Sequence, residues 1–196
     1  RAWLAHQVPS FTGLARLPVN VNLNNTCNAY LNGSSINLFR SGGGCHNTAF
    51  SDVILHEYGH EAVNYFTNGV TTPIWLDEGI ATAIEGVPEN YEEFVEEIAA
   101  SGRALDMQQL GDDWRRLPAD SAGLAYAQSR SMVEFLAARV GREGLLELLQ
   151  DLRSGMPAEA AFLRRTGMTQ ADFQRQWLAD VLRRARTAGA RTPSHP

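Results

Sequence analysis

The feature that most constrains this chain is an HExxH motif, which His56, Glu57 and His60 form within the helix-compatible residues 50–66. Positions i and i+4 of a helix lie one above the other, so both imidazoles can reach one metal ion. Glu57 lies about 100° around the helix from His56, beside the metal rather than under it. A carboxylate in that place can accept a proton from a water molecule that the metal activates. The motif therefore indicates a zinc hydrolase.

A structural alternative is a core helix that carries two histidines and an acid without binding a metal. The apolar residues spread around the whole helix, which marks it as buried; they are Val53, Ile54, Leu55, Ala62, Val63, Tyr65 and Phe66. A buried Glu57 between two histidines needs partners or a role, and a metal ion supplies both. Gly59 costs the helix roughly 1 kcal/mol relative to alanine, and its missing Cβ would let another backbone or a ligand approach closely. These features favour the metal site.

A catalytic zinc ion takes three protein ligands, and the motif supplies two of them. The metzincin pattern would continue with a glycine and then a histidine, but Val63 and Phe66 occupy those positions, which excludes that class. The third ligand must therefore come from another part of the chain.

A second helix is predicted over residues 73–85, because start and stop signals bound that stretch, and Glu78 lies near its beginning. If a short turn joins the two helices, they can pack antiparallel, and Glu78 can then face His60. Asp77 and Glu85 are the nearby alternatives for the ligand. Asp77 points about 100° away from Glu78, which suits an outer partner or a helix-start charge, and Glu85 is expected at the helix end.

The HExxH motif and the segment Trp75-Leu76-Asp77-Glu78-Gly79-Ile80-Ala81 together resemble the gluzincins, the thermolysin-like and aminopeptidase-like zinc peptidases. In that group, HExxH is followed by a W-x-x-E-G-x-A helix. The resemblance implies a zincin-like fold and a Zn²⁺ cofactor held by His56, His60 and Glu78. It also implies Glu57 as the general base and a peptide or protein substrate. An endopeptidase is expected, because the GxMEN-type motif with which aminopeptidases bind a free amine is not found ahead of His56.

Residues 125–136 resemble the helix that follows the glutamate helix in aminopeptidase-like gluzincins, where a tyrosine hydroxyl binds the oxyanion. The resemblance implies that Tyr126 donates to the tetrahedral intermediate. The alternative is a tyrosine packed in the helix core with its hydroxyl at the edge. His46 and Arg130 are the next candidates for the oxyanion role.

Strand signals occupy residues 18–23, 29–31 and 35–39, and Asn32-Gly33 reads as a hairpin turn, so a small antiparallel sheet is expected. In gluzincins, the sheet ends in an edge strand along the cleft that binds substrate as an added strand. By this resemblance the stretch 34–39 is that edge strand. Its residues Ser35, Ile36 and Asn37 are then expected to bind substrate. The alternative is an ordinary edge strand.

The remainder of the chain reads as helical, because apolar residues recur at helical spacing between glycine and proline stops. Helices are predicted over residues 88–102, 105–110, 121–140, 142–153, 157–166 and 170–188. The expected fold class is α+β, with a small antiparallel sheet and the metal helix followed by an all-helical C-terminal lobe. Residues 1–70 and 71–192 are expected to form two lobes of one catalytic domain.

The two cysteines, Cys27 and Cys45, lie in a segment rich in Asn, Gly and Ser, where burial as core residues is less natural. A disulfide between them is favoured and would constrain the unfolded chain by about 3 kcal/mol in the entropic description. Free thiols or a second metal site are the alternatives. A disulfide implies an oxidising compartment, so a bacterial protein of the extracellular space or the cell envelope is expected.

The charge balance is 17 basic against 22 acidic residues, a net charge of −5, which argues against a general nucleic-acid surface. No apolar run reaches membrane-spanning length. The first residues do not resemble a signal peptide, so a mature product or an excised domain is expected, and a monomer is favoured. Two rival functions share the same residues: a non-peptidase zinc hydrolase and a catalytically retired binding domain.

Overall fold

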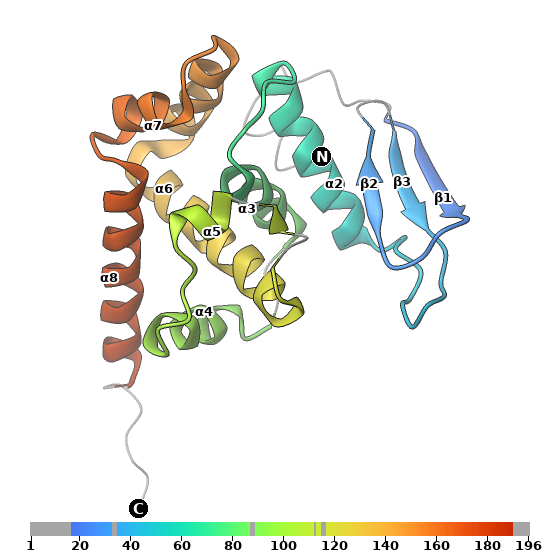
Figure 1. Cartoon of the computed structure of the whole chain (residues 1–196), viewed down its shortest axis with the longest axis horizontal. Helices are drawn as coiled ribbons and strands as arrows, with labels where there is room; N and C mark the ends of the chain where they lie inside the picture. The colour runs from blue at the N-terminus through green and yellow to red at the C-terminus, as the bar shows by residue number, and fades with distance from the viewer. Residues whose placement is uncertain (1–16, 33–34, 87–88, 112, 115–116, 190–196) are drawn as a thin grey trace, which may run out of the picture.

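The structure of the chain is a computed structural model that describes residues 17–32, 35–86, 89–111, 113–114 and 117–189. A small sheet lies at one end of the molecule, and a body of helices occupies the rest (Figure 1). Helix α2, which comprises Ser51–Thr67, lies between the sheet and the other helices. The predicted α+β class is confirmed.

The sheet contains three strands, β1 (Val19–Leu23), β2 (Ala29–Leu31) and β3 (Ile36–Phe39), in the order β1-β3-β2. Strands β2 and β3 pair antiparallel, whereas β1 and β3 pair parallel. The prediction of a wholly antiparallel sheet is therefore wrong. After β1 the chain crosses to the opposite edge of the sheet, where it forms β2. It then turns back, and β3 pairs with β2 on one side and with β1 on the other.

Strand β3 is hydrogen-bonded on both sides, and the prediction that it forms the edge of the sheet is wrong. Ser35, Ile36 and Asn37 are all buried, with 7%, 1% and 3% of their surface exposed. The side chain of Asn37 accepts a hydrogen bond from Asn20 of β1 at 2.9 Å, which ties the two parallel strands together. The sheet edge that faces α2 is β2 (Figure 1).

The predicted helices are confirmed, with boundaries shifted by a few residues. After α2 they are α3 (Ile74–Glu85), α4 (Tyr91–Ala100), α5 (Met107–Gly111), α6 (Ala119–Arg153), α7 (Ala158–Thr166) and α8 (Gln170–Gly189). Helix α6 covers two predicted helices, which meet at a kink where Gly141 has a φ of 71°. No helix of the described residues is both long and apolar enough to cross a lipid bilayer.

Helix α2 begins at Ser51, and the residue before it, Phe50, has an extended backbone and offers no side-chain cap. Thr48, although it lies close to the start of the helix, does not cap it. The Thr48 hydroxyl instead accepts a hydrogen bond from the backbone N–H of Phe39 at 2.8 Å. It thereby fixes the loop before α2 to the end of β3.

Two glycines allow the helices around the site to pack closely. A Cβ on Gly59 of α2 would lie 2.5 Å from the Cα of Ala81 in α3, so only glycine fits this contact. A Cβ on Gly79 of α3 would lie 2.5 Å from the carbonyl oxygen of Ser129 in α6. The expectation that Gly59 admits another backbone is confirmed.

Most of the main hydrophobic core is formed by α3 and the helices that follow it. Trp75 stacks on Phe173 of α8 and meets Phe162 of α7 edge to face, with ring centroids 6.1 and 6.0 Å apart. All three side chains are fully buried or nearly so. This aromatic cluster fixes α3 against the C-terminal helices, so α3 presents a rigid face toward α2.

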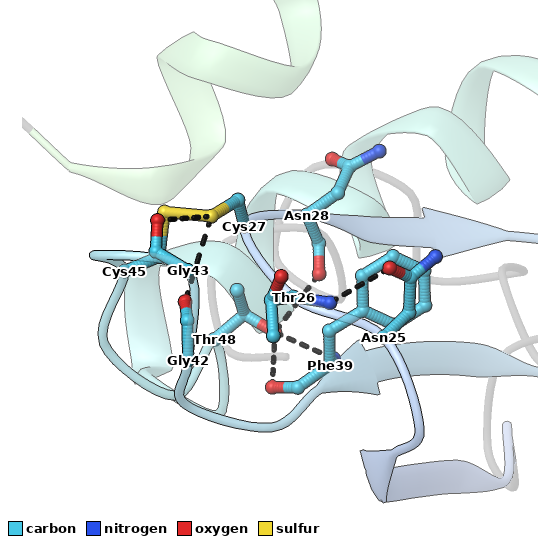
Figure 2. Close-up of a disulfide and its surroundings, with 9 residues drawn as sticks. All are labelled: Asn25, Thr26, Cys27, Asn28, Phe39, Gly42, Gly43, Cys45 and Thr48. Carbon is cyan, nitrogen blue, oxygen red and sulfur yellow. Dashed lines mark hydrogen bonds between the residues drawn. A yellow bond between two sulfur atoms is a disulfide. The ribbon is translucent and has the colours of Figure 1, made fainter.

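The predicted disulfide between Cys27 and Cys45 is present. Figure 2 shows that it joins the segment between β1 and β2 to the loop that leads to α2. Within that loop, Gly42 and Cys45 exchange backbone hydrogen bonds of 3.0 and 2.9 Å. The bond thus holds the start of β2 close to the approach to the metal helix.

Candidate metal centre

Helices α2 and α3 bring three ligand atoms to one point, as the sequence predicts for His56, His60 and Glu78. The Nε2 atoms of His56 and His60 are 3.1 Å apart. Oε2 of Glu78 lies 3.2 Å from the first and 3.4 Å from the second. All three residues are half-buried, and among the described residues they form the group with the spacing of a metal site.

The chemistry of this group fits a cation. Two imidazole nitrogens and a carboxylate oxygen are the donors that zinc accepts, and they leave a fourth position open. Oε2 of Glu78 is buried and makes no hydrogen bond with any described residue. An unsatisfied buried carboxylate oxygen is costly unless a cation compensates it. The residues present therefore fit a bound metal ion.

Each histidine also contacts a carboxylate of α3 through its other ring nitrogen. Nδ1 of His56 lies 2.9 Å from Glu85, and Nδ1 of His60 lies 3.0 Å from Asp77. Because an ionised carboxylate can only accept a hydrogen bond, Nδ1 is the donor in both pairs. This arrangement fixes each ring and directs the Nε2 lone pairs to the metal position. The expected outer role of Asp77 agrees with its contact, whereas the role of Glu85 was not foreseen.

The acidic surroundings make this point attractive to positive charge. Burial lowers the pKa of His56, but the neighbouring carboxylates of Glu78 and Glu85 outweigh burial and raise that pKa to about 9. Burial likewise lowers the pKa of His60, and Asp77 and Glu78 raise it to about 10. For Glu78, burial raises the pKa, but the two histidines lower it to about 2. A metal ion can take the place of the protons that the histidines otherwise hold.

Glu57 lies on α2 beside the ligands and is buried. Burial raises its pKa above the ordinary value, and the neighbouring His60 and His56 oppose this shift. The backbone N–H of Leu31 in β2 donates a hydrogen bond to its carboxylate. A carboxylate with a raised pKa is a better proton acceptor at neutral pH, so Glu57 has the properties of a general base.

Tyr126 reaches the same site from α6. Its ring centroid lies 5.9 Å from that of His56 and 5.0 Å from that of Trp114, which packs against it edge to face. Burial and the charges of Glu78 and Glu57 raise its pKa to about 12, so the hydroxyl remains a donor at neutral pH. It is 38% exposed and lines the cleft, which leaves it accessible to a substrate.

These groups line one open cleft of about 510 Å³, within the size range of small-ligand sites. One wall is the whole of β2, and the floor is α2; the lining residues are Asn28, Ala29, Tyr30, Leu31, His56, Glu57, His60, Asn64, Asp77, Glu78 and Tyr126. Ser35, Ile36 and Asn37 are not among them, because they lie in or beside the central strand. The expected edge position, which is the reason to place substrate on residues 34–39, is therefore wrong, and the strand that lines the cleft is β2.

Two residues of the site, Asn64 in the cleft wall and Glu85 against the ring of His56, could have been found from spacing alone. Asn64 is four residues after His60, on the same face of α2. Glu85 is seven residues after Glu78, which also places both on one face of α3. By contrast, Asn28 and Tyr30 are brought to the cleft by strand order, for which the sequence carries no local signal.

A profile of the Peptidase MA superfamily matches residues 34–183, which include the metal helix, α3 and most of the C-terminal helices. The chain belongs to the Peptidase MA superfamily. It is also similar to the uncharacterized protein YhcO of Bacillus subtilis (strain 168), with 24% identity over 133 residues. That match covers 65% of this chain and 40% of YhcO, so the chain spans less than half of its relative. No solved structure matches the chain.

In this member of the Peptidase MA superfamily, His46 and Arg130 do not line the cleft. Arg130 is buried, and its guanidinium donates to Glu134 at 2.9 Å and to the carbonyl oxygen of Thr82 at 3.0 Å. It also donates to the carbonyl oxygen of Gly86. Arg130 therefore binds the C-terminal end of α3 rather than a substrate, and Tyr126 is left as the oxyanion candidate at the site.

Proposed function

We propose that this chain is a zinc-dependent peptidase of the gluzincin type that hydrolyses internal peptide bonds. The observation that carries the proposal is the convergence of His56, His60 and Glu78 around a buried carboxylate oxygen with no hydrogen bond. Membership of the Peptidase MA superfamily supports the same reaction class. When bound, the zinc ion supplies Lewis-acid activation of a water molecule and of the scissile carbonyl group.

The protein's own groups carry the protons. Glu57 accepts a proton from the attacking water and returns it to the amine nitrogen that leaves. The Tyr126 hydroxyl donates a hydrogen bond to the carbonyl oxygen, which gains negative charge during the attack. Asp77 and Glu85 hold the histidine rings in place throughout.

The substrate is proposed to lie along β2 as an added strand. The outer edge of β2 faces the cleft and pairs with no other strand, and apart from the Leu31 N–H, which donates to Glu57, it offers the backbone groups that an extended peptide needs. This assigns the substrate contacts to residues 28–31 in place of Ser35, Ile36 and Asn37. The open cleft supports cleavage within a chain.

The disulfide supports a location outside the reducing cytosol. The bond between Cys27 and Cys45 persists in an oxidising compartment, such as the extracellular space or the bacterial cell envelope. Location there would give the peptidase extracellular or envelope proteins as substrates.

Cleavage of a mixed peptide library, followed by mass spectrometry, tests the proposal. The zinc-loaded protein is expected to cut internal bonds, and Glu57→Gln is expected to lose roughly 10²- to 10⁴-fold in rate while it keeps its zinc. The substitution removes the base without altering the ligands. Retained turnover in Glu57→Gln would refute the base role. Hydrolysis of esters but not peptides would favour a non-peptidase hydrolase, and no hydrolysis with zinc bound would favour a retired binding domain.

A further inference from the structure

A second cavity, of about 280 Å³, lies among α2, α3 and α6 and shares no lining residue with the metal cleft. Helix α2 lines it with Phe66, and α3 lines it with Ile80 and Ile84. Helix α6 contributes from both sides of its kink, with Ala137 before Gly141 and Leu145 after it. The walls are therefore aliphatic or aromatic, and Phe66, Ile80 and Leu145 are only partly buried.

Two charged side chains, Glu134 and Arg142, also line this cavity. The carboxylate of Glu134 is already compensated, because Nε of the buried Arg130 donates to it at 2.9 Å. The Tyr91 hydroxyl donates to it as well, at 3.5 Å. The charge of Glu134 is therefore balanced by Arg130, and no ligand is needed to compensate it.

Arg142, unlike Glu134, has no hydrogen bond or ion pair with any residue that the structure describes. Its side chain is exposed, so the guanidinium lies at the rim of the cavity. A guanidinium offers a planar fork that matches a carboxylate with two parallel hydrogen bonds. The cavity thus combines an apolar interior with one uncompensated cation at its mouth.

We propose that this cavity binds an aliphatic monocarboxylate, with the hydrocarbon chain between α2, α3 and α6 and the carboxylate on Arg142. The volume of about 280 Å³ lies just below the roughly 300–1,000 Å³ that is usual for ligand pockets, so a medium-length chain fits better than a long one. The cation selects an acid over an alcohol or an amine of the same length. This proposal does not depend on peptidase activity.

Isothermal titration calorimetry with octanoate and decanoate, each below its micelle concentration, tests the site. Each methylene buried in an apolar cavity is worth about fourfold in affinity, so decanoate, with two more methylenes, should bind roughly 15-fold more tightly than octanoate. Octyltrimethylammonium should not bind. Absence of decanoate binding to the native protein, or equal binding of the cationic amphiphile, would overturn the proposal.

Two variants test whether decanoate binds in this cavity. Arg142→Gln should weaken decanoate binding at least tenfold, whereas Arg139→Gln, an exposed arginine on the same helix that does not line the cavity, should not. Ala137→Phe, which fills the cavity, should abolish the dependence on chain length. Unchanged binding in Arg142→Gln or in Ala137→Phe would place the ligand elsewhere.

A carboxylate can also ligate zinc, so the titration is repeated on protein from which zinc has been removed. The proposed cavity is separate from the metal ligands, and binding should be the same with and without zinc. Binding that disappears with the metal would assign decanoate to the metal cleft and refute the second site.

Discussion

His56 and His60 depend on α3 for more than the third ligand. Glu78 supplies a ligand atom, while Asp77 and Glu85 of the same helix accept hydrogen bonds from the two Nδ1 atoms. A single rigid element therefore supplies one ligand and orients the other two. Because the three carboxylates cannot move independently, the site is preorganised for the metal ion that we propose.

The pKa shifts of the two histidines lead to a prediction about pH. In the metal-free protein the pKa values of about 9 and 10 lie above the ordinary 6.5. The protonated rings therefore stabilise the fold fully below pH 6.5, and this contribution is lost as the pH rises through 9 to 10. Zinc replaces these protons, so the increase in melting temperature that zinc causes should grow from pH 6 to pH 9.

Differential scanning fluorimetry across that range, with and without zinc, measures the effect. A zinc-induced increase that does not depend on pH would show that zinc and protons do not compete at His56 and His60. His46, whose side chain is not part of the metal group, offers a matched control. His46→Ala should leave the pH dependence unchanged.

Tyr126→Phe separates an oxyanion donor from a packing residue. If the hydroxyl stabilises charge that develops only in the transition state, kcat and kcat/KM should fall together by roughly a hundredfold to a thousandfold, with KM nearly unchanged. The hydroxyl is at the cleft and makes no hydrogen bond to the described residues, so the melting temperature should not change. Steady-state kinetics and a thermal melt on the same variant measure both. An unaltered rate would remove Tyr126 from the mechanism.

At the scale of the helices, the site depends on how closely α2 and α3 approach. Gly59→Ala adds a Cβ that would lie 2.5 Å from the Cα of Ala81, so the two helices must separate. We expect a loss of about 1–3 kcal/mol in stability and weaker zinc binding, because the ligands lie on both sides of this contact. Urea denaturation and a zinc titration measure the two effects.

Gly123→Ala is the matched control for this substitution. Gly123 lies in α6, is exposed, and a Cβ there would meet no atom within 4 Å. Alanine should stabilise the helix by about 1 kcal/mol without affecting zinc. If Gly59→Ala also left zinc binding unchanged and did not destabilise the protein, the close packing of α2 on α3 would not be what positions Glu78.

The helices and the convergence of the three candidate ligands could be predicted from the sequence because their signals are local. The spacing of His56 and His60 fixes a shared face, and the position of Glu78 near the start of the next helix follows from a short turn. The orienting role of Glu85 requires the distance between two helices, which Gly59 controls. The sequence suggests that contact but does not give its geometry.

At the scale of the whole molecule, strand order is what the sequence could not reveal. The strands themselves follow from alternation of polar and apolar residues, but β3 is inserted between β1 and β2 by long-range pairing. The edge that faces the metal is therefore β2, whose start the Cys27–Cys45 bond joins to the loop before α2 (Figure 2). The cleft is assembled from the sheet, α2, α3 and α6, so its walls depend on the complete fold.

Zinc content tests the central claim most directly. Elemental analysis of the purified, dialysed protein should find one zinc ion per chain, and Glu78→Ala should have lost it, because Glu78 supplies the third ligand atom. Glu61→Ala changes a carboxylate of α2 that is not part of the ligand group, so it should retain one zinc ion. Equal zinc in the native protein and in Glu78→Ala would contradict the account, because the metal would then be held by other residues.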